Sequence, residues 1–313
     1  MRVRFSQKGT QMITDNVTQY YQMHDRQCIE QFLPHKFDYT IVDESESADI
    51  CFCGVQHEDN TLLRDNEINI LLSVENLGCG RKHYASHNKF GDINNPKIDV
   101  FIYNHFSTPK LDGVPARAFP RVMPTHMFRQ RFFAREMGKF DDDTTCKFED
   151  KKFCLFVSQN TRNSNKEACV SQLHDLGDVD YITHPDFGHL LSEPCLHGRE
   201  LIRLFNTYKF IVCFENSNTA GYITEKIFNV FLSKSIPIYD GAPDIAQFVS
   251  GKAYVQFGDG YLRKIALLSE SQVLYDKVVG ERKLLNDPNN PILENYLDHY
   301  VEARLERKAD SPS

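Results

Sequence analysis

The densest group of chemically versatile residues in the chain lies in FENSNTAGYITEK, residues 214–226. An apolar stretch precedes it and a stretch with helical spacing follows, which is typical of a turn leading from a strand into a helix. Backbone N–H groups at a helix start attract anions, and a lysine there opposes the helix dipole unless an anion lies against it. Lys226 therefore predicts a bound phosphate, and the neighbouring Glu225 is suited to accept hydrogen bonds from sugar hydroxyls.

The same residues also have a purely structural interpretation. Asn, Ser, Thr and Gly are the usual residues of turns, and Thr224 is suited to cap the helix that follows. Glu225 and Lys226 would then be an ordinary solvated pair at a helix start. Neither G-x-G-x-x-G nor G-x-x-x-x-G-K-[ST] occurs in the chain, so a dinucleotide site or a P-loop has little support.

Alternating apolar and amphipathic stretches must position this turn. Strand–helix–strand units repeated along the second half predict a parallel sheet with helices on both faces, an α/β, Rossmann-like domain. The predicted strands cover residues 152–160, 179–183, 209–216 and 236–241, and the predicted helices cover 164–177, 198–208 and 222–235.

The first half allows a second domain of the same kind. Residues 67–76 and 96–104 have the composition of short buried strands, whereas 106–124 favours loop or edge structure. In an open α/β sheet, ligands bind beyond the carboxyl ends of the strands. Three segments that turn polar directly after an apolar strand are expected there: VSQNTRNSNK, FENSNTAGYITEK and SVENLGCG.

Length and charge limit the possible classes of protein. The chain has 313 residues, which suggests about two domains. The expected divisions are 1–145, 146–265 and a helical segment with a polar tail over 266–313. With 36 basic and 43 acidic residues the net charge is −7, which argues against a general nucleic-acid binder. No apolar stretch is long enough to predict a transmembrane segment, and the N-terminus lacks the apolar region of a secretory signal.

The nine cysteines are expected to be free thiols. Several lie in apolar stretches, where cysteine behaves as a small hydrophobic residue. Two zinc sites are conceivable, one from Cys51, Cys53 and Cys79 and the other around Cys195 and His197. Neither has the spacing of a structural zinc site, so no metal is predicted.

The segment YKFIVCFENSNTAGYITEKIFNVFLSKSIPIYDGAP, residues 208–243, resembles the donor-binding half of glycosyltransferase family 10, the α1,3/α1,4-fucosyltransferases. The family pattern is YKF, an apolar stretch, FEN(S/T), a turn, Y-V/I-T-E-K, a helix, and a strand ending in GAP. A weaker resemblance extends to SVEN, residues 73–76. The resemblance implies a GT-B architecture of two Rossmann-like domains facing across a cleft, GDP-fucose as donor substrate, an oligosaccharide acceptor and no required cofactor.

The resemblance also implies roles for individual residues. Glu75 in SVEN matches the carboxylate proposed as general base. Lys226 would stabilise the pyrophosphate, and Glu225 would hold a ribose or sugar hydroxyl. The donor-binding set consists of Asn216, Tyr222, Glu225 and Lys226, together with Glu215 and Thr224 of the same motifs.

Two positions depart from the family pattern. Where the family has a phosphate-binding arginine, the chain has Lys166, while Arg162 lies four residues earlier and is suited to reach the same phosphates. A lysine offers a point charge in place of the bidentate guanidinium, so either residue can fill the role. On the acceptor side, residues 77–125 match poorly, which leaves the acceptor open.

The function expected from the resemblance is an inverting fucosyltransferase that moves fucose from GDP-fucose to a GlcNAc-type hydroxyl of a glycan. Two alternatives stay open: a related transferase that uses another GDP-sugar, and a non-catalytic protein of this fold that binds GDP or glycans. The expected location is cytoplasmic, as in bacterial or viral members, or else that of a catalytic domain without its membrane anchor.

Overall fold

The computed structural model divides the chain into two compact units. The first unit comprises residues 1–128 and 289–313, and the second comprises residues 129–288. Each is described by itself below. The structure describes residues 1–6, 38, 40–43, 45–54, 63–72, 96–103, 110–111, 114–115, 121–124, 133, 137–138, 146–158, 164–183, 199–285, 301–302 and 306.

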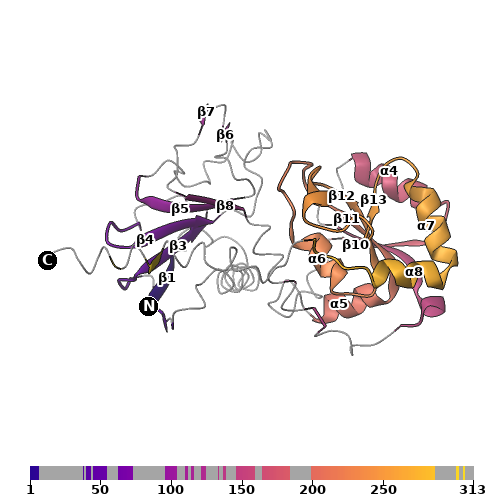
Figure 1. Cartoon of the computed structure of the whole chain (residues 1–313), viewed down its shortest axis with the longest axis horizontal. Coiled ribbons are helices and arrows are strands. Elements are labelled where there is room, and N and C mark those ends of the chain that lie inside the picture. Colours follow the sequence, from indigo (N-terminus) through magenta and orange to yellow (C-terminus); the bar gives the residue numbers. More distant parts are fainter. Residues whose placement is uncertain are drawn as a thin grey trace. The chain divides into compact units, whose positions relative to one another are not determined.

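The first unit is built on a parallel sheet of six strands in the order β2-β1-β3-β4-β5-β8 (Figure 1). β4 and β5 confirm the strands predicted over 67–76 and 96–104, and the edge position of β8 agrees with the edge structure expected for 106–124. The strands are β1 (Arg2–Ser6), β2 (Thr40–Ile41), β3 (Ile50–Gly54), β4 (Ile68–Leu72), β5 (Ile98–Tyr103) and β8 (Arg121–Pro124), with a short antiparallel pair β6 (Lys110–Leu111) and β7 (Val114–Pro115).

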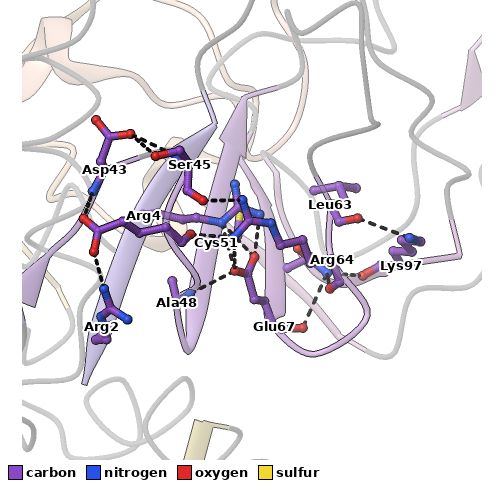
Figure 2. A network of polar contacts seen from close by, with 12 residues as sticks. Arg2, Arg4, Asp43, Ser45, Ala48, Cys51, Leu63, Arg64, Glu67 and Lys97 are labelled. Carbon is purple, nitrogen blue, oxygen red and sulfur yellow. Dashed lines mark hydrogen bonds and ion pairs between the residues drawn. The ribbon is translucent and has the colours of Figure 1, made fainter.

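A buried ion pair joins β1 to the turns that precede β3 and β4. The side chains of Arg4 and Glu67 are both 0% exposed. The Nε of Arg4 donates to both carboxylate oxygens of Glu67, at 3.0 and 2.8 Å, and its Nη2 donates to Oε2. Figure 2 shows that Glu67 also accepts from the backbone N–H of Ala48 at 2.9 Å and from Arg64 at 3.4 Å. A single carboxylate therefore connects three segments of the first unit.

Replacing Glu67 with alanine is expected to destabilise the first unit by about 3 kcal/mol, because the buried Arg4 guanidinium then loses its counter-charge. Hydrogen exchange of the β1, β3 and β4 amides measures this loss separately from the second unit. The double variant Arg4→Met/Glu67→Leu is expected to lose less, since no buried charge is left without its partner. Equal protection of these amides from exchange in Glu67→Ala and in the native protein would contradict a stabilising role of the Arg4–Glu67 ion pair.

The second unit has a parallel sheet of five strands in the order β10-β9-β11-β12-β13. This confirms the parallel α/β sheet predicted for the second half. The strands are β9 (Lys152–Ser158), β10 (Val179–Thr183), β11 (Tyr208–Phe214), β12 (Ile236–Asp240) and β13 (Val255–Gln256). The helices are α4 (Ser164–Leu173), α5 (Arg199–Asn206), α6 (Glu225–Phe231), α7 (Tyr261–Glu270) and α8 (Gln272–Val279), with 3-10 turns at Phe148–Asp150 and Ile245–Gln247.

Helices cover both faces of this sheet, as the pattern of strands and helices predicts. On one face, α5 and α6 pack with side chains such as Cys213 and Tyr239. On the other face, α4, α7 and α8 pack with side chains such as Phe214 and Val255 (Figure 1). Successive residues of a strand face opposite sides of a sheet, so each central strand contributes to both cores.

Several predicted boundaries differ from those observed. α6 stops at Phe231 and not near residue 235, because Ser233 and Ser235 turn their hydroxyls to backbone carbonyls and the Lys234 N–H donates to Asn206. α4 ends at Leu173, four residues before the predicted end at Gly177. A side chain at Gly177 would meet the Phe153 ring at 2.6 Å.

The predicted division at residue 265 falls inside α7. Tyr261, Ile265 and Leu268 of this helix are buried in the same core as β9 and β11. Of the helical segment with a polar tail expected over 266–313, the structure describes residues 266–285, 301–302 and 306. Among the described helices, none has the length and apolar character needed to cross a bilayer.

Candidate functional site

The carboxylate of Glu215 lies at the centre of the candidate site. β11 ends at Phe214, and the next residue, Glu215, is only 1% exposed. Its carboxylate accepts the backbone N–H of Thr224 at 2.7 Å and the Thr224 hydroxyl at 2.6 Å. Thr224 is the N-cap of α6 and accepts the N–H of Lys226 at 3.4 Å, which confirms the predicted cap. The carboxylate thus fixes the start of α6 at the carboxyl end of β11.

Lys226 is held by the same group of residues. Its ammonium nitrogen lies 3.0 Å from the Thr224 hydroxyl, 3.4 Å from Glu215 Oε2 and 3.5 Å from Glu225 Oε1. These contacts fix the ammonium in place, and the side chain as a whole keeps 32% of its surface exposed.

The ionisation of Lys226 follows from these contacts. Burial lowers the pKa of Lys226, but the carboxylates of Glu225 and Glu215 outweigh this effect and raise the pKa above its usual value of 10.5. The side chain therefore carries its positive charge throughout the physiological range. A fixed, charged and partly exposed ammonium at a helix start is suited to bind an anion.

The turn between β11 and α6 is shaped by its own backbone. Gly221 has a φ of 75°, which favours glycine, and its N–H donates to the Asp244 carboxylate at 2.8 Å. The N–H of Tyr222 donates to the Thr219 carbonyl at 3.0 Å, and the Tyr222 side chain is buried. Asn216 is half-buried at the start of the turn. The segment therefore brings all six predicted residues from 215 to 226 to the carboxyl edge of the sheet, as expected.

Lys166 lies in the first turn of α4 and is only 4% exposed. It affects the pKa of the same thiol as Lys226 does, that of Cys213 on β11. Burial raises the pKa of Cys213 well above its usual value, Glu215 and Glu225 raise it further, and Lys226 and Lys166 each lower it. Arg162 and Glu75 lie outside the described residues, so the choice between Lys166 and Arg162 stays a prediction.

Tyr239 and Gly241 support the site and were not singled out from the sequence. Tyr239 is fully buried, and its hydroxyl accepts the N–H of Ala242 at 3.1 Å. A side chain at Gly241 would lie 2.4 Å from this hydroxyl and 2.5 Å from Cγ of Glu215. The glycine of the GAP motif is therefore required by close packing. The motif itself was the signal in the sequence that pointed to this position.

Gly241→Ala is expected to destabilise the second unit by roughly 1–3 kcal/mol, because neither Tyr239 nor Glu215 has room to move. Thermal unfolding followed by circular dichroism measures the change. Gly251→Ala is the matched control: a side chain there meets no atom within 4 Å, and its effect is expected to stay within about 0.5 kcal/mol. Equal unfolding temperatures for the two variants would contradict the packing argument.

The described part of the chain contains no cluster of three or more His, Cys, Asp or Glu side chains suited to hold a metal ion. The five cysteines whose side chains the structure describes are free thiols, in agreement with the prediction: Cys51, Cys146, Cys154, Cys169 and Cys213. Cys79, Cys195 and His197, named for the two conceivable zinc sites, lie outside the described residues.

Comparison with known proteins shows what this part of the chain is similar to. Residues 146–270 match the model of glycosyltransferase family 10 (fucosyltransferase), C-terminal region. An alpha-(1,3)-fucosyltransferase of Helicobacter pylori is 46% identical over 136 residues, which cover 44% of this chain and 27% of that protein. Alpha-(1,3)-fucosyltransferase B of Drosophila melanogaster is 29% identical over 123 residues, 37% of this chain and 27% of that protein. The alignments thus span about a quarter of each relative's length.

A third relative carries a different name. GDP-fucose protein O-fucosyltransferase 3 of Xenopus tropicalis is 29% identical over 169 residues, covering 46% of this chain and 31% of that protein. Among solved structures, an alpha1,3-fucosyltransferase crystallised with GDP-fucose is similar with a TM-score of 0.57 and 16% identity, covering 96% of this chain and 90% of that chain. An alpha1,3-fucosyltransferase crystallised with GDP is similar with a TM-score of 0.58 and 17% identity, and the coverage of both chains is the same. This likeness confirms the predicted GT-B fold class.

Proposed function

Because residues 146–270 carry the C-terminal domain of glycosyltransferase family 10, we propose that this protein transfers L-fucose from GDP-fucose to a GlcNAc-type hydroxyl of a glycan acceptor, with inversion at the anomeric carbon. The observation that carries the proposal is the fixed cation of Lys226. It is held by Glu215, Thr224 and Glu225 at a helix start, where the proposal puts the diphosphate.

The reaction is a single displacement. The acceptor oxygen forms a bond to the anomeric carbon while the bond from that carbon to the phosphate oxygen breaks, and GDP leaves with the bonding electron pair. Negative charge grows on the diphosphate as the bond breaks. A cation that is already in place stabilises this charge without having to reorganise. Lys226 fills this role, and Lys166 or Arg162 adds a second positive charge.

The other residues of the turn hold the sugar and the nucleotide. Glu225 keeps 22% of its side chain exposed and is positioned to accept a ribose or sugar hydroxyl. Asn216 and Tyr222 line the same turn and complete the donor contacts. Glu215 and Thr224 act on the donor through Lys226, since both contact its ammonium and bind each other.

The acceptor hydroxyl must lose its proton during the displacement, and a carboxylate within hydrogen-bond reach of that hydroxyl serves as the base. We assign this role to Glu75, which directly follows the β4 region in sequence and so belongs to the segment expected beyond the carboxyl end of a strand.

A transfer assay with GDP-fucose on an array of glycans tests the proposal. Fucose incorporation into GlcNAc-containing glycans is the expected result, and the linkage of the product distinguishes α1,3 from α1,4 transfer. Peptide acceptors belong on the same array, because one relative is named a protein O-fucosyltransferase. Transfer to peptides alone would replace the proposed acceptor class, and no transfer to either kind would contradict catalysis.

A further inference from the structure

A second carboxylate at the carboxyl edge of the sheet, Asp240, has no role in the site described above. It is the last residue of β12, and it pairs with Phe214, the last residue of β11. The residue is only 8% exposed. Because Tyr239 faces α5 and α6, the side chain of Asp240 faces the opposite side of the sheet, where α4 packs.

Asp240 connects two segments that are far apart in sequence. Its Oδ2 accepts the side-chain amide of Asn165 in the first turn of α4 at 3.1 Å. Its Oδ1 accepts the side-chain amide of Asn218, in the turn between β11 and α6, at 2.9 Å. The carboxylate thus fixes the distance between the start of α4 and the turn.

The arrangement parallels that of Glu215 on the other face of the sheet. Glu215 binds Thr224, two residues before Lys226, and Asp240 binds Asn165, directly before Lys166. The backbone N–H of Glu215 donates to the Asp240 carbonyl at 2.8 Å, so the two carboxylates belong to adjacent residues at the same edge of the sheet, and both lysines lower the pKa of the Cys213 thiol. Each of the two lysines therefore follows a residue that is bonded to a carboxylate at a strand end.

We propose that Asp240 is a positioning residue for the diphosphate: by binding Asn165 and Asn218 it sets the place of Lys166 relative to Lys226. The inference rests on the proposed function, since it takes GDP as the ligand that both lysines meet. Asp240 itself need not touch the ligand. Its effect on GDP binding is transmitted through the start of α4.

A double-mutant cycle on GDP affinity tests this role. Calorimetric titration of GDP compares the native protein with Asp240→Asn, Lys166→Ala and the double variant. Each single substitution is expected to raise the Kd about tenfold, and the double variant about as much as one of them, because Lys166 acts only when it is correctly placed. If the two effects multiply instead, so that the Kd for GDP of the double variant rises about a hundredfold, the inference is overturned.

An exchanged pair supplies the second test. Asn165→Asp combined with Asp240→Asn restores a carboxylate–amide hydrogen bond with the roles reversed, and the Kd for GDP is expected to return to within about threefold of the native value. If Asp240→Asn does not fold, Asn165→Ala keeps the carboxylate and is expected to weaken GDP binding about fivefold. No change of Kd in Asn165→Ala would overturn the inference as well.

Matched measurements separate this role from simple stabilisation. Asp180→Asn removes a carboxylate from the other part of the same sheet, where it binds Lys152 and Tyr208, and is expected to leave the Kd for GDP unchanged. A lower melting temperature in Asp240→Asn with unchanged GDP affinity would show a structural role only and overturn the inference. A native protein that does not bind GDP at all would contradict the proposed function itself.

Discussion

Replacing Lys226 with alanine is expected to lower kcat/KM for GDP-fucose by roughly 10²–10³-fold, the effect of removing one preorganised donor from a site where negative charge develops. The ammonium is held by three neighbours within 3.5 Å, so its loss removes a charge that needs no reorganisation before it acts. The affinity for GDP is expected to fall together with the rate, because the leaving group carries the charge that Lys226 meets.

Two control variants define this prediction. Lys226→Arg keeps the charge with a different geometry and is expected to retain part of the GDP affinity. Lys152→Ala removes a lysine of the same sheet that is 64% exposed and paired with Asp180. This variant is expected to change neither kcat/KM for GDP-fucose nor the Kd for GDP. Since the pKa of Lys226 is raised above 10.5, native GDP affinity is expected not to fall between pH 7 and 9 through loss of this charge. Unaltered GDP affinity in Lys226→Ala would count against a phosphate role.

Replacing Glu75 with alanine is expected to reduce transfer by roughly 10²–10⁴-fold, the usual contribution of a general base. The Kd for GDP is expected to stay within about twofold of the native value, because the base meets the acceptor and not the nucleotide. Transfer is measured with GDP-fucose and the best acceptor from the glycan array, and GDP binding by calorimetry.

This separation of rate from affinity identifies the role of Glu75. The amide in Glu75→Gln keeps the shape of the side chain but accepts a proton poorly, so it is expected to be as defective as the alanine variant. Native transfer rates in either variant would refute Glu75 as base. Loss of GDP binding in both would show instead that the residue contributes to the donor site.

Much of the second unit could be predicted from its sequence because its signals are local. Residues 210–214 of β11 form a continuous apolar stretch that is buried on both faces, and an abrupt change to polar residues marks its end. Thr224 caps α6 through an atom two residues away. The cluster around Glu215 could be predicted from the sequence for the same reason, since Thr224 and Lys226 follow Glu215 within 11 residues.

The features that were missed depend on contacts between distant residues. Arg4 places a charge in the middle of β1, which argues against a buried strand until Glu67, 63 residues later, supplies the counter-charge. Asp240 and Asn165 are 75 residues apart, and only the parallel register of β12 with β11 brings the carboxylate to the edge where α4 begins. No spacing rule within one segment reveals such pairs.

The central claim is that the site around Lys226 binds GDP-fucose and activates it, and a panel of GDP-sugars tests this claim most directly. The native protein is incubated separately with GDP-fucose, GDP-mannose and GDP-glucose, and the release of GDP is measured with Lys226→Ala in parallel. The account predicts release from GDP-fucose that depends on Lys226. Turnover of GDP-mannose without turnover of GDP-fucose would contradict it.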